Sequence, residues 1–137
     1  MSSQSTKTPR GIRNNNPLNI RIGNTWLGEV PDPTDSNFEQ FVHIRYGLRA
    51  AFCILRRYIR RYKRNTVRKI VTAWAPSTEN NTERYIQLVC KFGCLDADAE
   101  IHFEDSLTMC SLVQAMARVE VGEIIPLQTI EDAYKIA

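Results

Sequence analysis

Residues 106–122 read SLTMCSLVQAMARVEVG and form the most apolar helical pattern in the chain. The apolar side chains of this stretch recur at spacings of three and four residues and comprise Leu107, Cys110, Leu112, Val113, Met116, Ala117 and Val119. A stripe this wide is typical of a helix with little solvent-facing surface. We therefore expect the other elements of the fold to pack around this helix.

Glu120 lies near the carboxyl end of the predicted helix, just before Gly122. A carboxylate in that position faces the negative end of the helix dipole, and burial would penalise its charge further. Both effects raise the pKa of a carboxyl group, which is what a general acid needs near neutral pH. The alternative is a carboxylate that points to water where the helix frays. Glu120 is thus a candidate catalytic residue.

Length and composition describe one globular domain. The chain has 137 residues and a net charge of +3, with positive charge concentrated between Arg45 and Lys69. No apolar run is long enough to cross a bilayer, and residues 1–13 lack the apolar core of a signal peptide. We expect a flexible leader at residues 1–9, a single domain at residues 10–137, and a protein that is made and kept in a cytoplasm unless something else releases it.

The cysteine pattern predicts no metal site. The chain has four cysteines, which are Cys53, Cys90, Cys94 and Cys110. In a chain without an export signal, reduced core thiols are the default. Cys90 and Cys94 are separated by three residues, which matches no standard pair of zinc ligands, and the chain has only two histidines. We expect neither a metal nor another cofactor.

Residues 10–21 read RGIRNNNPLNIR and are dense in turn-forming residues. Asparagine tolerates left-handed backbone and its side chain bonds nearby amides, so this segment is expected to be a rigid loop. Side-chain amides also suit the hydroxyl and acetamido groups of a sugar chain. Asn15, Asn16 and Asn19 are therefore either turn formers or ligand-binding residues.

The next segment alternates aromatic or apolar residues with turn residues around a proline-rich middle. We predict a small, irregular β-hairpin in which residues 26–30 pair with residues 37–42. Trp26 either stacks on a sugar ring or anchors the hairpin to the core. Among the carboxylates of the hairpin, Glu29 and Asp35 are the candidates for a chemical role.

The clearest helix runs from about residue 46 to residue 63, with one apolar face and one face rich in arginine. Shorter helices are predicted from their capping residues, after Thr66, after Asn81 or Thr82, and near Thr129. The fold class is therefore mainly α, with about five helices and the small hairpin. The basic face is interpreted as a solvated surface, with binding of nucleic acid or of an anionic cell-wall polymer as alternatives.

Four segments of the chain carry a resemblance. They are RGIRNNNPLNIR at residues 10–21, the Trp26-x-Gly28 motif, FEQFVHIRYGLRA at residues 38–50 and WAPSTENNTERY at residues 74–85. Together they resemble a family of small phage and prophage proteins, often labelled virion structural proteins and thought to be lysozyme-like enzymes that degrade peptidoglycan. The resemblance implies a lysozyme-like fold and synthesis in a bacterial host. It further implies glycan strands of peptidoglycan as the substrate, other virion proteins as partners, and a place in the virion or at the cell wall. That family usually has Glu-Asn-Gly where this chain has Glu120-Val121-Gly122.

A second resemblance concerns the order of the segments. Residues 16–21 (NPLNIR), with Trp26-x-Gly28, are similar to the segment that follows the catalytic glutamate in bacterial glucosaminidases, which share the lysozyme-like fold. In those enzymes the glutamate helix comes first, whereas QAMARVEVG lies at residues 114–122 of this chain. We therefore predict a circularly permuted lysozyme-like fold, which is feasible because chain termini lie at surfaces and often close together. Permutation would bring Glu120 close to Tyr85.

Cleavage of a glycosidic bond needs a proton for the leaving oxygen and support for an oxocarbenium-like transition state. Glu120 is the predicted acid. A second carboxylate, if one is used, is expected to be Glu29 or Asp35; otherwise the substrate's own groups act, as in lytic transglycosylases, where the 6-hydroxyl of the sugar attacks. The predicted substrate-binding residues are Asn15, Asn16, Asn19, Trp26 and Tyr85.

Two functions of other classes stay open on the sequence. The first is a non-catalytic virion structural or cell-wall-binding protein of the same fold, which would bind sugar without cleaving it. The second is a nucleic-acid-binding helical protein that uses the basic segment from Arg56 to Lys69. It would show DNA affinity that falls steeply with salt.

Overall fold

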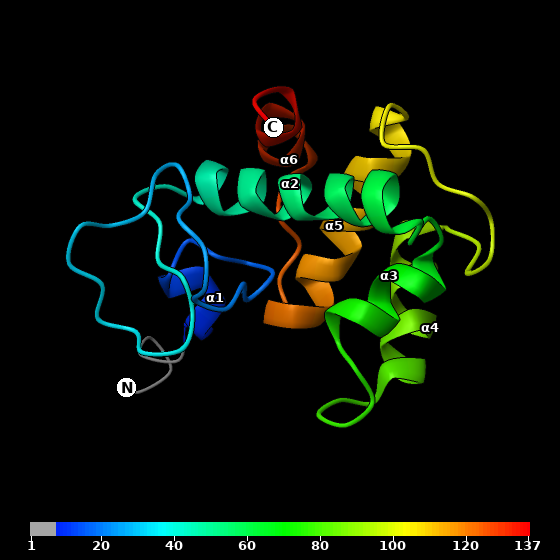
Figure 1. Cartoon of the computed structure of the whole chain (residues 1–137), viewed down its shortest axis with the longest axis horizontal. Helices are drawn as coiled ribbons and strands as arrows, with labels where there is room; N and C mark the ends of the chain where they lie inside the picture. The colour runs from blue at the N-terminus through cyan, green and yellow to red at the C-terminus, as the bar shows by residue number, and fades with distance from the viewer. Residues whose placement is uncertain (1–7) are drawn as a thin grey trace.

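The computed structural model describes residues 8–137, so residues 1–7 of the predicted leader lie outside the described part of the chain. Within residues 8–137 the elements are α1 (Arg10–Arg13), α2 (Ile44–Tyr62), α3 (Val67–Trp74), α4 (Thr82–Gly93), α5 (Ser106–Val121) and α6 (Leu127–Lys135) (Figure 1). The prediction of a mainly α fold is confirmed, and α1 is a short helix that the turn-rich N-terminal sequence concealed. None of the helices in the described range has the length and apolar character needed to cross a bilayer.

α5 occupies the centre of the fold. It packs against α4 and α6 and also contacts α1 and α2 (Figure 1). Its buried residues are Met109, Cys110, Leu112, Val113, Ala115, Met116, Ala117 and Val121. Leu107 departs from the predicted stripe, since it lies in the exposed first turn and is 70% exposed.

α2 is the longest of the described helices and runs across the molecule (Figure 1). It begins after His43, whose ring nitrogen accepts a hydrogen bond from the Arg45 amide, and it ends at Lys63 in the left-handed conformation. These boundaries agree with the predicted helix to within two residues. Its apolar face is buried, and its opposite face carries the arginines.

Helices α3 and α4 begin at two of the predicted caps. The side chain of Thr66 accepts a hydrogen bond from the Lys69 amide, and that of Asn81 accepts one from the Arg84 amide. The predicted cap at Thr129 is wrong, because α6 begins at Leu127, directly after Pro126. A proline loses no helical hydrogen bond at a helix start, so Pro126 sets this boundary without a side-chain cap.

The predicted hairpin is not confirmed. The described segment between α1 and α2 has no regular strand and pairs only through two isolated antiparallel bridges, Arg21 with Phe38 and Glu29 with Phe41. The paired regions share a few backbone hydrogen bonds, such as those from the Val30 amide to Gln40 and from the Val42 amide to Gly28, and side-chain hydrogen bonds to the backbone hold the rest of the segment. It lies with α1 on one side of the carboxyl end of α5, while α3 and α4 lie on the other (Figure 1).

The junction between α2 and the N-terminal loop leaves no room for a side chain at Gly47. A Cβ atom there would lie 2.0 Å from the backbone oxygen of Asn15. We predict that Gly47→Ala lowers the free energy of unfolding by about 1–3 kcal/mol, because the loop backbone must shift to relieve the overlap. Urea unfolding tests this, with Gly23→Ala as the control, since no atom lies within 4 Å of its Cβ position. Equal midpoints for Gly47→Ala and wild type would contradict the packing described.

Candidate active site

Glu120 lies in the last turn of α5 and is held from two sides. The side-chain amide of Asn19 donates a hydrogen bond to Oε1 at 2.8 Å, and the Tyr85 hydroxyl donates one to Oε2 at 2.9 Å. Asn19 belongs to the loop after α1, whereas Tyr85 belongs to α4. The carboxyl group therefore joins two segments that are distant in sequence and lie on opposite sides of the end of α5 (Figure 1).

The local backbone conformation at Asn19 and at the end of α5 brings the side chains of Asn19 and Glu120 together. Asn19 has a φ of 53°, a left-handed conformation that asparagine tolerates. Its side chain passes beside Gly11 of α1, where a Cβ atom would lie 2.8 Å from Asn19 Oδ1. α5 stops at Gly122, whose φ of 75° is unstrained for glycine. The helix therefore ends with Glu120 next to the loop that carries Asn19.

Burial raises the pKa of Glu120 above its ordinary value of 4.5. The hydrogen bonds from Asn19 and Tyr85 and the charge of Arg21 act in the opposite direction, because they favour the ionised form. Tyr85 is buried, and its burial, followed by the neighbouring carboxylate, raises the pKa of its hydroxyl well above the ordinary value. Tyr85 is thus a permanent donor, while Glu120 can give up a proton and recover it.

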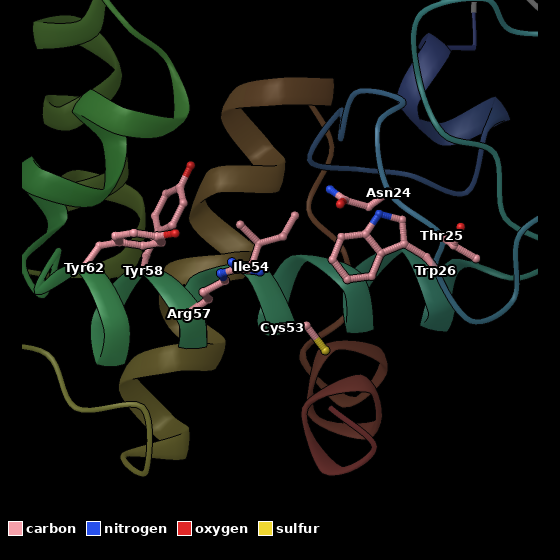
Figure 2. Close-up of a pocket in the computed structure, with 8 residues that line it drawn as sticks. All are labelled: Asn24, Thr25, Trp26, Cys53, Ile54, Arg57, Tyr58 and Tyr62. Atoms are coloured by element: carbon pink, nitrogen blue, oxygen red, sulfur yellow. The ribbon is translucent and has the colours of Figure 1, made fainter.

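A groove starts beside Asn19 and continues along α2. Its near end is lined by Asn19, Ile20, Arg21, Asn24, Ile54, Tyr58 and Trp74. Its far end has a volume of about 510 Å³ and is lined by Asn24, Thr25, Trp26, Cys53, Ile54, Arg57, Tyr58 and Tyr62 (Figure 2). Because Asn24, Ile54 and Tyr58 line both ends, the two hollows adjoin, and we call them together the α2 groove. Aromatic rings with a few amide and guanidinium groups are typical of a ligand site.

The structure separates the predicted substrate-binding residues into two groups. Asn19 and Tyr85 contact Glu120, and Trp26 lines the far end of the α2 groove with its Nε1 atom buried and unpaired among the described residues. Asn15 donates instead to a backbone carbonyl, at Phe41.

Asn16 is a structural residue of the same loop. Its side chain is fully buried, and its amide bonds the backbone of Ile20 and Glu39. Because it has no exposed surface, Asn16 has the structural role of a turn former, the other of the two roles that its sequence allowed. Its three hydrogen bonds fix the loop that presents Asn19.

Asp35 does not contact Glu120 and is committed to an ion pair. Its carboxylate accepts hydrogen bonds from the Arg10 guanidinium at 2.6 and 2.7 Å, from Asn14 at 2.9 Å and from two amides of its own loop. These contacts, Arg10 foremost, hold the pKa of Asp35 far below its usual range. An anion so fully engaged cannot donate a proton, and it ties the loop to α1.

Glu29 pairs with a carboxyl group that the sequence did not single out, that of Glu39. Glu39 is 4% exposed, and burial, reinforced by the hydrogen bond and the charge of Glu29, raises the pKa of Glu39 to about 7. Glu29 also accepts a hydrogen bond from the Trp26 amide. Neither carboxyl contacts Glu120; both line a further hollow of about 600 Å³ within the loop segment between α1 and α2.

Other groove residues were missed because they come from separate elements. Asn24 lies in an irregular loop and Trp74 at the end of α3, where no local pattern marks them. Tyr58 and Tyr62 did leave a signal. They are four residues apart at the edge of the apolar face of α2, a spacing that places both side chains together.

Comparison with known proteins gives one relationship. No protein-family model matches the chain. The chain is 36% identical over 124 residues to Protein P5 of Pseudoalteromonas phage PM2, an alignment that covers 88% of this chain and 76% of that protein. The chain belongs to the family of Protein P5. The expected relationship to phage proteins is thereby confirmed.

Within residues 8–137 of this P5-family chain, no group of three or more His, Cys, Asp or Glu side chains could hold a metal ion. The groups that meet at the site are Glu120 and its two hydrogen-bond donors, Asn19 and Tyr85. A lone acid with an adjoining groove suits proton transfer to and from a bound ligand.

The raised pKa of Glu39 predicts a pH dependence of stability. Between pH 4.5 and about 7 the unfolded chain loses this proton while the folded chain keeps it, so stability falls as the pH rises. We predict that Glu39→Gln removes this fall and stabilises the protein at pH 8 by about 1–3 kcal/mol. Urea unfolding from pH 5 to pH 8 tests this, with Asp32→Asn, an exposed carboxylate of the same loop, as the control. A parallel pH profile for Glu39→Gln and wild type would refute the assignment.

Proposed function

We propose that this P5-family protein cleaves the glycan strands of peptidoglycan, with Glu120 as the general acid. The observation that carries the proposal is the half-buried carboxyl group of Glu120, with a raised pKa, held by Asn19 and Tyr85. The α2 groove, which begins at Asn19, offers aromatic rings and amides to a sugar chain. Glycosidic cleavage requires an acid that can keep its proton near neutral pH, and Glu120 is joined to the groove through its hydrogen bond with Asn19.

The chemistry follows from the position of the proton. Protonated Glu120 delivers its proton to the glycosidic oxygen as the bond from that oxygen to the anomeric carbon breaks. The departing sugar leaves with its hydroxyl restored, and the anomeric carbon becomes an oxocarbenium-like centre. The Glu120 carboxylate then takes a proton from the attacking hydroxyl, which returns the enzyme to its starting state.

The surroundings of the other carboxyl groups favour attack by the substrate itself. Asp35 is bound by Arg10, and Glu29 is paired with Glu39, so neither carboxylate accompanies Glu120. We therefore propose a lytic transglycosylase type of reaction, in which the 6-hydroxyl of the sugar attacks its own anomeric carbon. This leaves a 1,6-anhydro end and consumes no water. A muramidase would add water at the same step.

The proposed fold is a permuted lysozyme-like one. Glu120 comes from the last third of the chain, yet it contacts Tyr85 and the loop that resembles the segment following the glutamate in glucosaminidases. This contact supports the view that α5 stands where those enzymes place their first helix. The P5 family membership is consistent with the phage context that the proposal requires.

Glu120→Gln is the variant that tests the proposal. Gln keeps the size of the side chain but carries no acidic proton, so we predict that release of soluble fragments from purified peptidoglycan falls at least 100-fold, within the range that general acid catalysis contributes. Mass spectrometry of the digest identifies the ends, since an anhydro product is lighter than a hydrolysis product by one water molecule. Glu123→Gln, at an exposed carboxylate three residues further on, should digest as wild type does. Binding of the wall without release by wild type would instead support a structural protein.

The hydrogen bond from Tyr85 predicts a shift in the pH profile. The Tyr85 hydroxyl stabilises ionised Glu120, so its removal in Tyr85→Phe leaves burial less opposed and raises the pKa of Glu120 further. We predict that the alkaline limb of kcat/KM moves to higher pH by about one unit. Cleavage rates from pH 5 to pH 9 measure this. A shift toward lower pH would contradict the role given to Tyr85.

A further inference from the structure

Three arginines converge on one tyrosine at the far end of the α2 groove. The guanidinium carbons of Arg57, Arg61 and Arg64 lie 6.0, 5.8 and 5.0 Å from the centre of the Tyr62 ring. All three are within range of a cation–π contact. None of them forms an ion pair with a carboxylate of residues 8–137, whereas Arg10, Arg21, Arg60 and Arg68 do. We call these three residues the arginine cluster.

The backbone holds the arginine cluster together despite its like charges. Arg57 and Arg61 are four residues apart on α2 and share one face. Lys63 then reverses the chain in the left-handed conformation, and the Arg64 guanidinium stacks on the ring of Tyr58 at 4.8 Å. The field is strong enough that a hydrogen bond from Arg57, with the neighbouring charges, lowers the pKa of the exposed Tyr62 hydroxyl. Like charges repel, so this arrangement favours an anion between them.

The arginine cluster adjoins the surface that would hold a glycan. Arg57 lines the far end of the α2 groove together with Trp26, Tyr58 and Tyr62 (Figure 2). Figure 2 shows Trp26 from the loop and Tyr58 from α2 on the same side of that helix. A sugar chain that runs from Glu120 along this groove would bring its substituents to the cluster. The stem peptides of peptidoglycan are such substituents, and they carry carboxylates.

We propose that the arginine cluster binds stem-peptide carboxylates of the glycan strand, so that the protein selects strands that carry peptides over strands that lack them; this inference rests on the proposed function. The planar guanidinium group suits carboxylates because it offers two parallel donors. Trp26 and Tyr58 provide faces for the sugar rings in between. The cluster is thus a specificity site, separate from the proton donor.

The contacts of two further arginines of α2, Arg56 and Arg60, do not favour a nucleic-acid surface. Arg56 and Arg60 stack on Phe103, and Arg60 is paired with Glu104. Of the arginines that line the α2 groove, Arg21 is paired with Glu79 and Arg57 has no carboxylate partner, so the unpaired charge of the groove lies at one end, whereas a duplex needs an extended basic stripe. A single carboxylate-bearing peptide matches the size of the cluster better.

The test is a binding measurement that does not depend on catalysis. Calorimetry uses the Glu120→Gln chain with two probes, glycan fragments that carry stem peptides and the same fragments after an amidase has removed them. We expect the peptide-bearing fragments to bind about 3- to 10-fold more tightly at low salt, a difference that added salt reduces. Adding Arg57→Gln and Arg61→Gln should bring the ratio of affinities close to one. Adding Lys91→Gln and Lys135→Gln, which remove two exposed charges outside the groove lining, should leave the ratio intact.

Several outcomes overturn the inference. Equal affinity of the Glu120→Gln chain for both fragments would do so, as would a ratio that survives the two arginine substitutions. Tighter binding of a DNA duplex, lost in the same arginine variant, would make the cluster a nucleic-acid site. Failure of wild type to cleave any strand, with the peptide-dependent ratio intact, would contradict the proposed function alone.

Discussion

The site depends on the two hydrogen bonds that the carboxyl group of Glu120 accepts. This carboxyl group lies at the end of the central helix, where the helix dipole and burial both oppose its charge. Two hydrogen bonds offset this penalty, and they come from two parts of the chain that both pack against α5. The loop after α1 reaches it through Asn19, and α4 reaches it through Tyr85. The half-buried carboxyl group of Glu120 thus connects α5, α4 and the loop after α1.

The balance between burial and hydrogen bonding also distinguishes the roles of three carboxyl groups, those of Asp35, Glu39 and Glu120. Asp35 is held by a guanidinium and by backbone amides, so its charge is stabilised and its proton is lost. Glu39 is buried beside the carboxyl group of Glu29, and its pKa is raised to about 7, so it keeps its proton under mildly acidic conditions. Glu120 lies between these extremes, since burial raises its pKa while two donors restrain the rise. Such a balance is what allows a carboxyl group to act both as an acid and as a base.

Local patterns in the sequence predicted the helices well and the loop poorly. The apolar stripe of α5, the two-faced α2 and the caps at Thr66 and Asn81 follow from the spacing and chemistry of adjacent residues. The hairpin is not confirmed because side chains such as those of Asn16 and Gln40 bond the loop backbone where a ladder would continue. The cap at Thr129 failed because Pro126 already starts the helix. The sequence could not show that Asp35 is committed to an ion pair, because its partner Arg10 is 25 positions away, beyond any local pattern. The contact between Asn19 and Glu120 spans 101 positions, and only a family resemblance indicated it.

The most direct test of this account is a carboxyl-carbon NMR titration of Glu120 in the folded protein. The account predicts a pKa above the ordinary value of 4.5, and a further rise when Tyr85→Phe removes one of the two donors. A pKa at or below 4.5, unchanged in Tyr85→Phe, would mean that Glu120 is a solvated carboxylate at a helix end. In that case the role of Glu120 as a general acid, and with it the candidate active site, would be contradicted.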